Sequence, residues 1–389
     1  MAPPMRFFSL LLAIPASADI LFATSYNDHT VTSLRLEGST LSVVGKNLDC
    51  GSEPTWLTLD KTKSRLYCLN EGWGGNASLT SYQTRADGKL TTLDILPVLK
   101  SPVSSTLWGA NNERLAVAHY DTSTFSSYDV SNAKDLRLTK SETYTLAAPG
   151  PVPDRQEAPH LHDAILDPTR KFLVSPDLGA DLLRLYRITG NSWTAITPAK
   201  AVPGSGPRHG GFAVHGPNTY FYTVNELSNT ITGYKVTYSG SSISFAQILN
   251  FSTHGPGGSV PAGTSSAELE ISPDQRFVLI SSRNEASLTI PAFDGSATTI
   301  PSDPIISFAI NPASGQLTLT QIAPAGGLNP RGFSLNKAGT LVASALQNDN
   351  RVVVYKRDVK TGKLGAVVAS ATVGEGANNG PNYVLFNDC

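Results

Sequence analysis

Two histidines stand one residue apart in PHLHDAILDP, residues 159–168, at the start of an apolar run. In an extended strand His160 and His162 would point to the same face, a spacing that suits two ligands of one metal ion. A metal needs further ligands, and no Asp, Glu or His set at matching positions accompanies them, so we expect no metal and no cofactor. Two interpretations stay open: a histidine that transfers protons near neutral pH, or one that caps a strand through hydrogen bonds.

Charged residues recur further along the chain in short, related motifs. They are Arg208 in GPRHGG, Glu226 in VNEL, Glu268 in SAELEIS, Arg283 in SSRN and Arg331 in NPRGF. Arginine offers a permanently charged, planar fork for a carboxylate or phosphate. Arginines could bind an anionic substrate and stabilise growing negative charge, while a histidine activates water and a glutamate orients it or serves as a second acid or base. The alternative is that these side chains only form ion pairs that brace the fold.

Several function classes are disfavoured by what the chain lacks. There is no G-x-S-x-G and no Ser/His/Asp order, so the sequence does not indicate an acyl-enzyme. No phosphate-binding glycine motif follows a strand to open a helix, which argues against nucleotide binding. The net charge is −1, and no basic stripe is present, so nucleic acid is an unexpected partner. A small-molecule substrate is expected instead, and it can be anionic because local charge need not follow net charge.

The elements that must position these residues read as strands. Short β-branched and aromatic runs recur, and each is followed by a turn and another strand-like run. The first runs are RLYCL, RLAVAHY, KFLVSPDL, TYFYTVNEL, RFVLISSRN and TLVASALQN, and the partner runs are SLTSYQT, TFSSYDV, LLRLYRI, TITGYKV, SLTI and RVVVYKR. Helical periodicity is almost absent, so the sequence predicts an all-β fold.

These units repeat with similar openings. They start near positions 54, 102, 159, 207, 266, 330 and 381, about 48 to 64 residues apart, which suits a four-stranded propeller blade. PNYVLF at 381–386 resembles a first strand, and ILFATSYNDHTVTSLRL at 20–36 supplies the strands that follow it. We therefore predict one seven-bladed β-propeller domain over residues 19–389, closed by strands from both termini. Two β-sandwich domains are the alternative, but a sandwich would not repeat its opening.

The N-terminus predicts export. Arg6 precedes the apolar run 7–14 and the small residues Ala16-Ser17-Ala18, so we expect a signal peptide over residues 1–18 and a secreted protein. The apolar run is too short to span a membrane, and no membrane partner is expected. A cytosolic start that happens to be apolar is the alternative.

Cysteines and glycosylation signals fit an exported chain. Cys50 and Cys68 could form a disulfide, leaving Cys389 unpaired, or could be buried thiols. Asn76-Ala-Ser and Asn250-Phe-Ser are acceptors for N-glycosylation if the chain enters a eukaryotic secretory route.

Four longer stretches carry a family resemblance. PHLHDAILDPTRKFLVSPDLGADLLRLY, GPRHGGFAVHGPNTYFYTVNEL, SAELEISPDQRFVLISSRN and NPRGFSLNKAGTLVASALQNDNRVVVY resemble the lactonase family of seven-bladed propellers. That family includes 6-phosphogluconolactonase of the bacterial propeller type and fungal carboxy-cis,cis-muconate cyclase. The resemblance covers essentially the whole mature chain, but AVAHYDTSTFSSYDV departs from it, because the family has two glycines at this strand turn.

The resemblance implies an enzyme and a site. It implies a lactone hydrolase or an intramolecular lyase acting in the central channel on a small anionic or sugar-derived substrate. It places His162, Arg208, Glu226 and Arg283 in the catalytic pocket and matches Glu268 to a family glutamate. Arg208 and Arg283 would also bind substrate, together with Glu268 and Arg331, whereas His160 has no counterpart in the family. The alternative is a non-catalytic secreted propeller that binds a metabolite or glycan.

Overall fold

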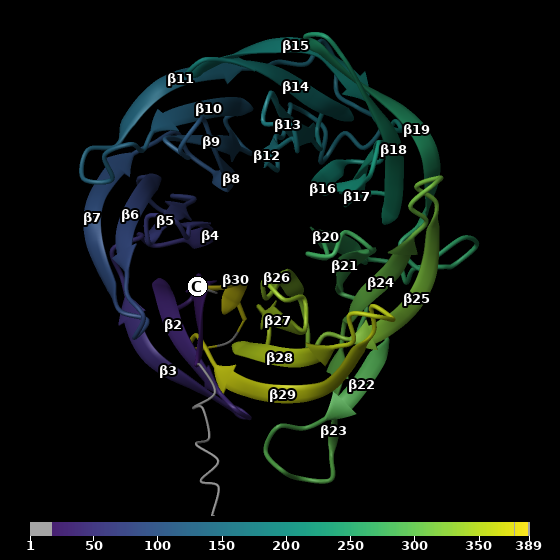
Figure 1. Cartoon of the computed structure of the whole chain (residues 1–389). Coiled ribbons are helices and arrows are strands. Elements are labelled where there is room, and N and C mark those ends of the chain that lie inside the picture. Colours follow the sequence, from purple (N-terminus) through teal and green to yellow (C-terminus); the bar gives the residue numbers. More distant parts are fainter. Residues whose placement is uncertain (1–17, 377, 388–389) are drawn as a thin grey trace, which may run out of the picture.

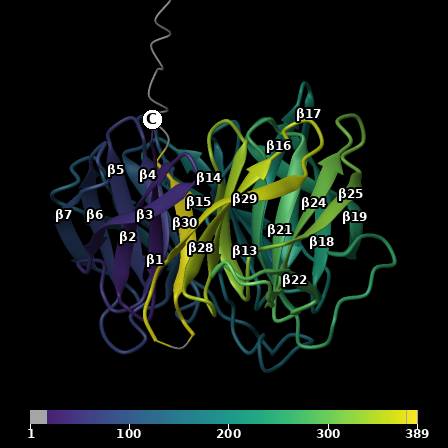
Figure 2. The ribbon, with the colours of Figure 1, turned by 90° about the horizontal axis from the view of Figure 1, so that it is seen from below.

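Seven four-stranded antiparallel sheets surround a central channel (Figure 1). The structure is a computed structural model, and it describes residues 18–376 and 378–387. Within those residues no helix is long and apolar enough to cross a membrane. The seven sheets confirm the predicted all-β, seven-bladed propeller. The side view shows the blades packed side by side around the ring (Figure 2).

Each blade runs outward from an inner strand at the channel. The first three blades in chain order contain β4 (Pro54–Asp60), β5 (Arg65–Asn70), β6 (Ser78–Thr84) and β7 (Leu90–Pro97); β8 (Pro102–Trp108), β9 (Arg114–His119), β10 (Thr124–Asp129) and β11 (Arg137–Thr143); and β12 (Ile165–Leu166), β13 (Phe172–Asp177), β14 (Leu182–Thr189) and β15 (Ser192–Lys200). The next three contain β16 (Pro207–His215), β17 (Asn218–Asn225), β18 (Thr230–Ser239) and β19 (Ser242–Ser252); β20 (Ser265–Ile271), β21 (Phe277–Arg283), β24 (Pro304–Ile310) and β25 (Leu317–Pro324); and β26 (Pro330–Leu335), β27 (Leu341–Leu346), β28 (Arg351–Arg357) and β29 (Leu364–Thr372).

The seventh blade joins the two ends of the chain. Its strands are β30 (Pro381–Phe386), β1 (Asp19–Ser25), β2 (Thr30–Glu37) and β3 (Thr40–Asn47). The C-terminal β30 is its inner strand and pairs with β1 in antiparallel register, with Ala23 opposite Val384. This pairing confirms the predicted closure, which leaves no open sheet edge at the junction of the ring.

One unit differs from its predicted strand pattern. SLTI, expected to pair within its blade, instead forms β22 (Leu288–Pro291) of a separate hairpin with β23 (Thr299–Ser302), and β21 pairs with β24. The hairpin projects outward from the ring (Figure 1). The Asp303 carboxylate accepts hydrogen bonds from the backbone N–H groups of Glu285 and Ala286, which hold the turn that diverts the chain. This insertion explains why that unit is the longest.

Apolar packing between neighbouring blades forms the core. Phe125 of β10 stacks on Tyr186 of β14, in the next blade, with ring centroids 4.1 Å apart. Trp193 packs edge-on against both rings and is fully buried. Such aromatic pairs contribute about 0.5–1.5 kcal/mol each beyond their buried area. Rigid packing of this kind holds the inner strands, and therefore the channel residues, in fixed positions.

A repeated irregularity aims side chains into the channel. Five inner strands open with a proline, which suits a strand's first position because proline lacks an N–H. One residue later each of them shifts register against its neighbour, and the skipped residues are Thr55, Val103, Arg208, Arg331 and Asn382. A β-bulge re-aims the extra side chain, and all five of these residues line the cavity at the channel.

A disulfide stands close to the junction of two blades. Cys50, in the connection that leads to β4, is bonded to Cys68 of β5, with Cα atoms 5.9 Å apart. The pairing that the sequence left open is therefore present. Residues 1–17 and Cys389 lie outside the described residues, so the signal peptide stays a prediction.

Candidate active site

A cavity of about 380 Å³ opens at one mouth of the channel. This volume falls within the range of small-molecule sites. Its walls are formed by Glu71, Trp73, Val103, Tyr120, Asp121, Arg155, His162, Arg208, Glu226, Arg283, Arg331 and Gln347. Deeper in the channel a second cavity of about 10 Å³ shares His162, Arg208 and Arg331 with the first and reaches His209 and Glu268. Six of the seven residues picked out from the sequence, all except His160, thus line one or both of these neighbouring cavities.

The two histidines of PHLHDAILDP have different surroundings. His162 lines the cavity, whereas His160 packs flat against Tyr120, with ring centroids 4.2 Å apart, and its Nε2 lies 2.9 Å from Glu157. Both histidines contact the ring of Tyr120, although the segment is not a regular strand, because only an isolated bridge at Leu161 precedes the short β12. The backbone N–H of His160 donates to Asp177, which helps to hold this irregular segment.

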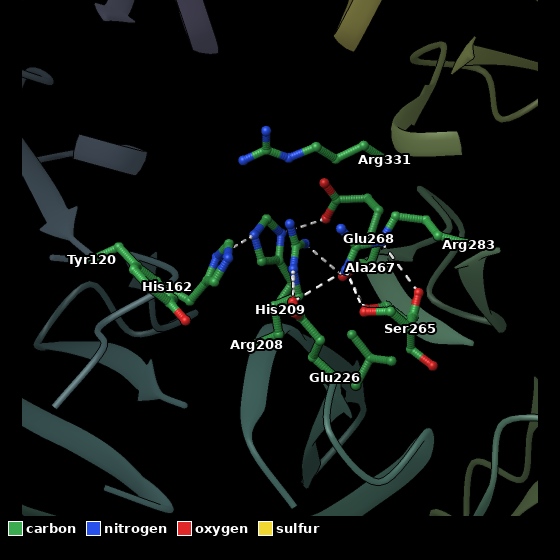
Figure 3. Close-up of polar contacts among 12 residues, drawn as sticks. Tyr120, His162, Arg208, His209, Glu226, Ser265, Ala267, Glu268, Arg283 and Arg331 are labelled. Atoms are coloured by element: carbon green, nitrogen blue, oxygen red, sulfur yellow. Dashed lines mark hydrogen bonds and ion pairs between the residues drawn. The ribbon is translucent and has the colours of Figure 1, made fainter. Parts of the chain in front are cut away.

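A chain of three buried side chains ends at His162 (Figure 3). Nε2 of His209 lies 3.2 Å from Nδ1 of His162, and Nδ1 of His209 lies 2.7 Å from Oε1 of Glu268. The backbone N–H of Leu269 donates to the same Glu268 oxygen, so this oxygen carries no proton of its own. It therefore accepts from Nδ1 of His209, which is the donor. With His209 neutral, its Nε2 accepts from His162, and Nε2 of His162 keeps its lone pair. No described residue forms a hydrogen bond with that nitrogen.

The surroundings of His162 favour its neutral form. Burial holds the pKa of His162 well below its usual range, and the positive charges of Arg208 and Arg331 reinforce the effect. A neutral imidazole with a free lone pair that faces a cavity can act as a general base. This arrangement gives His162 the geometry of a group that takes a proton from water.

Glu226, next to the cavity, is held by three arginines. Its Oε2 lies 2.8 Å from Nε of Arg208 and 3.2 Å from Nη2 of Arg283, and its Oε1 lies 2.7 Å from Nη2 of Arg155. Burial alone would raise the pKa of Glu226, but the three positive charges lower it to about 2. A carboxylate bound in this way favours a role in positioning the arginines over one in carrying protons.

Two of these arginines keep donors for a ligand. Arg208 also donates from Nη1 to the backbone oxygen of Ala267, and Arg283 donates from Nε and Nη2 to Ser265 (Figure 3). Nη2 of Arg208 and Nη1 of Arg283 form no hydrogen bond to any described residue. Burial lowers the pKa of Arg283 to about 10, despite the opposing charge of Glu226, so its guanidinium stays charged at neutral pH. The pair can therefore bind an anion.

The fourth arginine of the cavity, Arg331, is held by a different carboxylate. Nη2 of Arg331 lies 3.3 Å from Oε1 of Glu71, and Nη1 contacts the hydroxyl of Tyr26, which itself donates to Glu71. Burial raises the pKa of Tyr26, so the tyrosine stays protonated. Arg331 is thus fixed by a carboxylate and a phenol.

Sequence reasoning missed several members of the site. His209 stands beside Arg208 in the same GPRHGG motif, and the alternation of a regular strand would have turned it away from the channel. The bulge at the strand opening reverses that expectation. Glu71, Tyr26 and Tyr120 each directly follow the second strand of a blade, as Glu226 does. That shared position in the repeat is a signal that could have found them.

Acidic side chains continue along the channel. Burial raises the pKa of Glu270, two residues beyond Glu268, and the negative charges of Glu268 and Asp163 add to the shift. Burial likewise raises the pKa of Asp163. In the described part of the chain, no three His, Cys, Asp or Glu side chains are grouped so that they could hold a metal ion.

Comparisons with known proteins agree with this architecture. Residues 20–385 match the family model described as Lactonase, 7-bladed beta-propeller. A protein of Arthroderma benhamiae named "Probable 6-phosphogluconolactonase" is 32% identical over 92% of this chain and 88% of its own length. The 6-phosphogluconolactonase of Bacillus subtilis is 25% identical over 82% of this chain and 84% of its own. The periplasmic gluconolactonase of Pseudomonas aeruginosa superposes with a TM-score of 0.78 at 25% identity, over 95% of this chain and 99% of that one. This chain belongs to the lactonase family of seven-bladed β-propellers.

Proposed function

We propose that the protein hydrolyses a small, anionic, sugar-derived lactone in the channel cavity, with His162 as the base that activates water. The observation that carries the proposal is the chain from Glu268 through His209 to His162 at the cavity wall; with His209 neutral, this chain leaves Nε2 of His162 as an unprotonated acceptor. The relatives named 6-phosphogluconolactonase and gluconolactonase support a lactone substrate. A protein that only bound a metabolite or glycan would not need this proton-transfer chain.

The reaction balances with these groups alone. Nε2 of His162 takes a proton from water as the water oxygen bonds to the lactone carbonyl carbon. The carbonyl oxygen becomes an oxyanion, which the positive charges of Arg208 and Arg331 beside His162 stabilise. When the tetrahedral intermediate collapses, the bond to the ring oxygen breaks, and the imidazolium returns its proton to that oxygen. The product is an open-chain hydroxy acid.

The charges of the cavity favour an anionic substrate. Four arginines line it, namely Arg155, Arg208, Arg283 and Arg331. Among the described residues, three carboxylates line it as well: Glu226 and Glu71, which pair with these arginines, and Asp121. Four arginines against three carboxylates leave one positive charge in excess, which a carboxylate or phosphate on the substrate would offset through the open donors on Arg208 and Arg283.

A substrate panel tests this proposal. Purified protein is assayed in a pH-stat with glucono-δ-lactone, 6-phosphoglucono-δ-lactone and a lactone without charge or hydroxyl groups, and with a carboxymuconate so that lactone formation would also register. We expect turnover of the sugar lactones, fastest for the anionic one. Binding of these compounds without turnover of any would overturn the proposal in favour of a binding propeller.

We also propose that the protein is secreted after removal of residues 1–18. The disulfide between Cys50 and Cys68 supports an oxidising compartment. The exposure of Asn76 and Asn250 is compatible with N-glycosylation at both sites. N-terminal sequencing and glycosidase treatment of protein from the native host test the proposal, and an intracellular product that retains Met1 would contradict it.

A further inference from the structure

Trp73 is a large aromatic side chain that stays half exposed at the rim of the cavity. It lies in the connection from β5 to β6, its exposed fraction is 51%, and it forms part of the cavity wall. Trp73 has no role in the proposed hydrolysis. A single exposed aromatic on a protein surface needs no explanation, but one that lines a substrate cavity and is held in place does.

The indole is held by two contacts. Its Nε1 donates to Oε2 of Glu71 at 2.7 Å, and the ring of Tyr26 lies 4.8 Å away at an angle of 50°. The loop reaches this position through a tight turn at Gly72, whose φ is +73°. A Cβ at Gly72 would lie 2.3 Å from the backbone nitrogen of Ala77, so only glycine fits there. Trp73 is therefore pre-organised before any ligand arrives.

The same carboxylate that orients the indole also holds an arginine. Oε2 of Glu71 accepts from Trp73, and Oε1 pairs with Arg331. The buried Glu71 side chain thus fixes the distance between the indole ring of Trp73 and the guanidinium of Arg331. A ligand that matches both would carry an apolar face on one part of a ring and an anionic or carbonyl group on another.

We propose that Trp73 is a specificity-determining platform on which the C–H face of a cyclic sugar lactone packs, so that the cavity selects sugar lactones over small anions. The face of a sugar ring is apolar, whereas its hydroxyl groups point outward along the edge. Tyr120, Asp121 and Gln347 also line the cavity and offer polar partners for those hydroxyls. The inference rests on the proposed function for its substrate class, but the platform itself can be tested by binding alone.

The experiment compares W73A and W73F with L138A, a matched control. Leu138 lies on the outer strand β11, has an exposed fraction of 53% and lines none of the site cavities. For each variant, KM and kcat are measured with a sugar lactone, and calorimetry gives the dissociation constants of the corresponding aldonate and of inorganic phosphate. Circular dichroism and melting confirm folding, and W73F keeps the test informative if W73A is unstable.

The platform predicts a selective loss. For W73A we expect KM for the sugar lactone and Kd for the aldonate to rise about 5- to 10-fold, the usual size of a stacking contact, with kcat within about twofold of wild type. W73F should recover most of the affinity, and phosphate binding should be unchanged in every variant. Unchanged sugar affinity in W73A would overturn the inference. Equal losses for sugar and phosphate would overturn it too, because Trp73 would then act only through Arg331.

The two proposals fail in different ways. If wild type hydrolyses no lactone while W73A still weakens aldonate binding and spares phosphate, the platform stands and the hydrolytic function falls. If wild type hydrolyses sugar lactones and W73A behaves like L138A, the hydrolytic function stands and the platform falls.

Discussion

Nδ1 of His209 lies 2.7 Å from Oε1 of Glu268, and both side chains are almost completely buried beneath the floor of the cavity. This contact fixes which nitrogen of His209 carries its proton, and through the next hydrogen bond it sets the tautomer of His162. Two residues that the substrate does not reach thus decide whether His162 presents a lone pair or an N–H to the cavity.

His162→Ala should lower kcat by about 10²–10⁴-fold with little change in KM, the usual share of general acid–base catalysis. His160→Ala is the matched control, because His160 packs behind Tyr120 outside the cavity. Steady-state kinetics on a sugar lactone checks both variants. A larger loss from His160→Ala, together with inactivation by EDTA, would make PHLHDAILDP a metal site and refute this assignment.

Glu268→Gln should lower kcat and leave KM unchanged, since it replaces the charged acceptor of the His209 Nδ1 proton by a neutral amide oxygen, which supports positive charge along the histidine chain less well. We expect a loss of about 10- to 100-fold, by analogy with the carboxylates that orient metal-bound histidines, whose replacement costs that much. Glu270→Gln, on the same strand, is the control, because burial already favours the neutral acid there. A shift of the acid limb of the pH profile in Glu268→Gln, absent in Glu270→Gln, would separate positioning from a general loss of packing. Identical kinetics for the two variants would contradict the role of Glu268.

Arg208→Lys and Arg283→Lys should each raise KM for an anionic lactone by about 10-fold. Lysine keeps the positive charge but loses the planar fork, so it cannot pair with Glu226 and still offer a second nitrogen to the substrate. Kinetics with charged and uncharged sugar lactones check this, and the loss should be smaller for the uncharged one. Equal losses for both would show that these arginines support the fold and do not bind an anion.

Activity should persist in weakly acidic solution. Because burial and neighbouring arginines depress the pKa of His162, the base form survives when pH falls below 6.5. The acid limb of kcat/KM should therefore lie well below the pKa of a free histidine. A pH–rate profile on a lactone that hydrolyses slowly by itself gives the measurement. An acid limb centred near pH 6.5 would mean that His162 is not the titrating base.

Stability should fall in acid through Glu226. Its pKa of about 2 in the folded state lies below the ordinary value of 4.5, so the carboxylate stabilises the fold above about pH 4.5, and the contribution is lost as pH falls toward 2. The shift corresponds to about 3 kcal/mol. Denaturant unfolding at pH 7 and pH 3 checks this: Glu226→Gln should be less stable at pH 7 and lose less on acidification. An unchanged pH dependence in the variant would contradict it.

The sequence by itself determined the ring and most of the site's residue types. Repeated openings with strand-like runs fix an all-β propeller, because each unit can bury its apolar face only against a neighbour, and the split unit at the termini fixes its closure. His162, Arg208, Glu226, Arg283 and Arg331 stand out because they occur at recurring positions in those units.

Tertiary structure alone decided which side chains meet in the site. Regular alternation cannot foretell the bulge that turns His209 toward His162, since a one-residue register shift reverses which side chains face the channel. Nor could spacing reveal that Glu226 is shared by three arginines, one of them Arg155 from a long loop. These contacts join residues of successive blades, 47 positions apart for His162 and His209 and 71 for Arg155 and Glu226, so their distances are set only when the blades pack side by side.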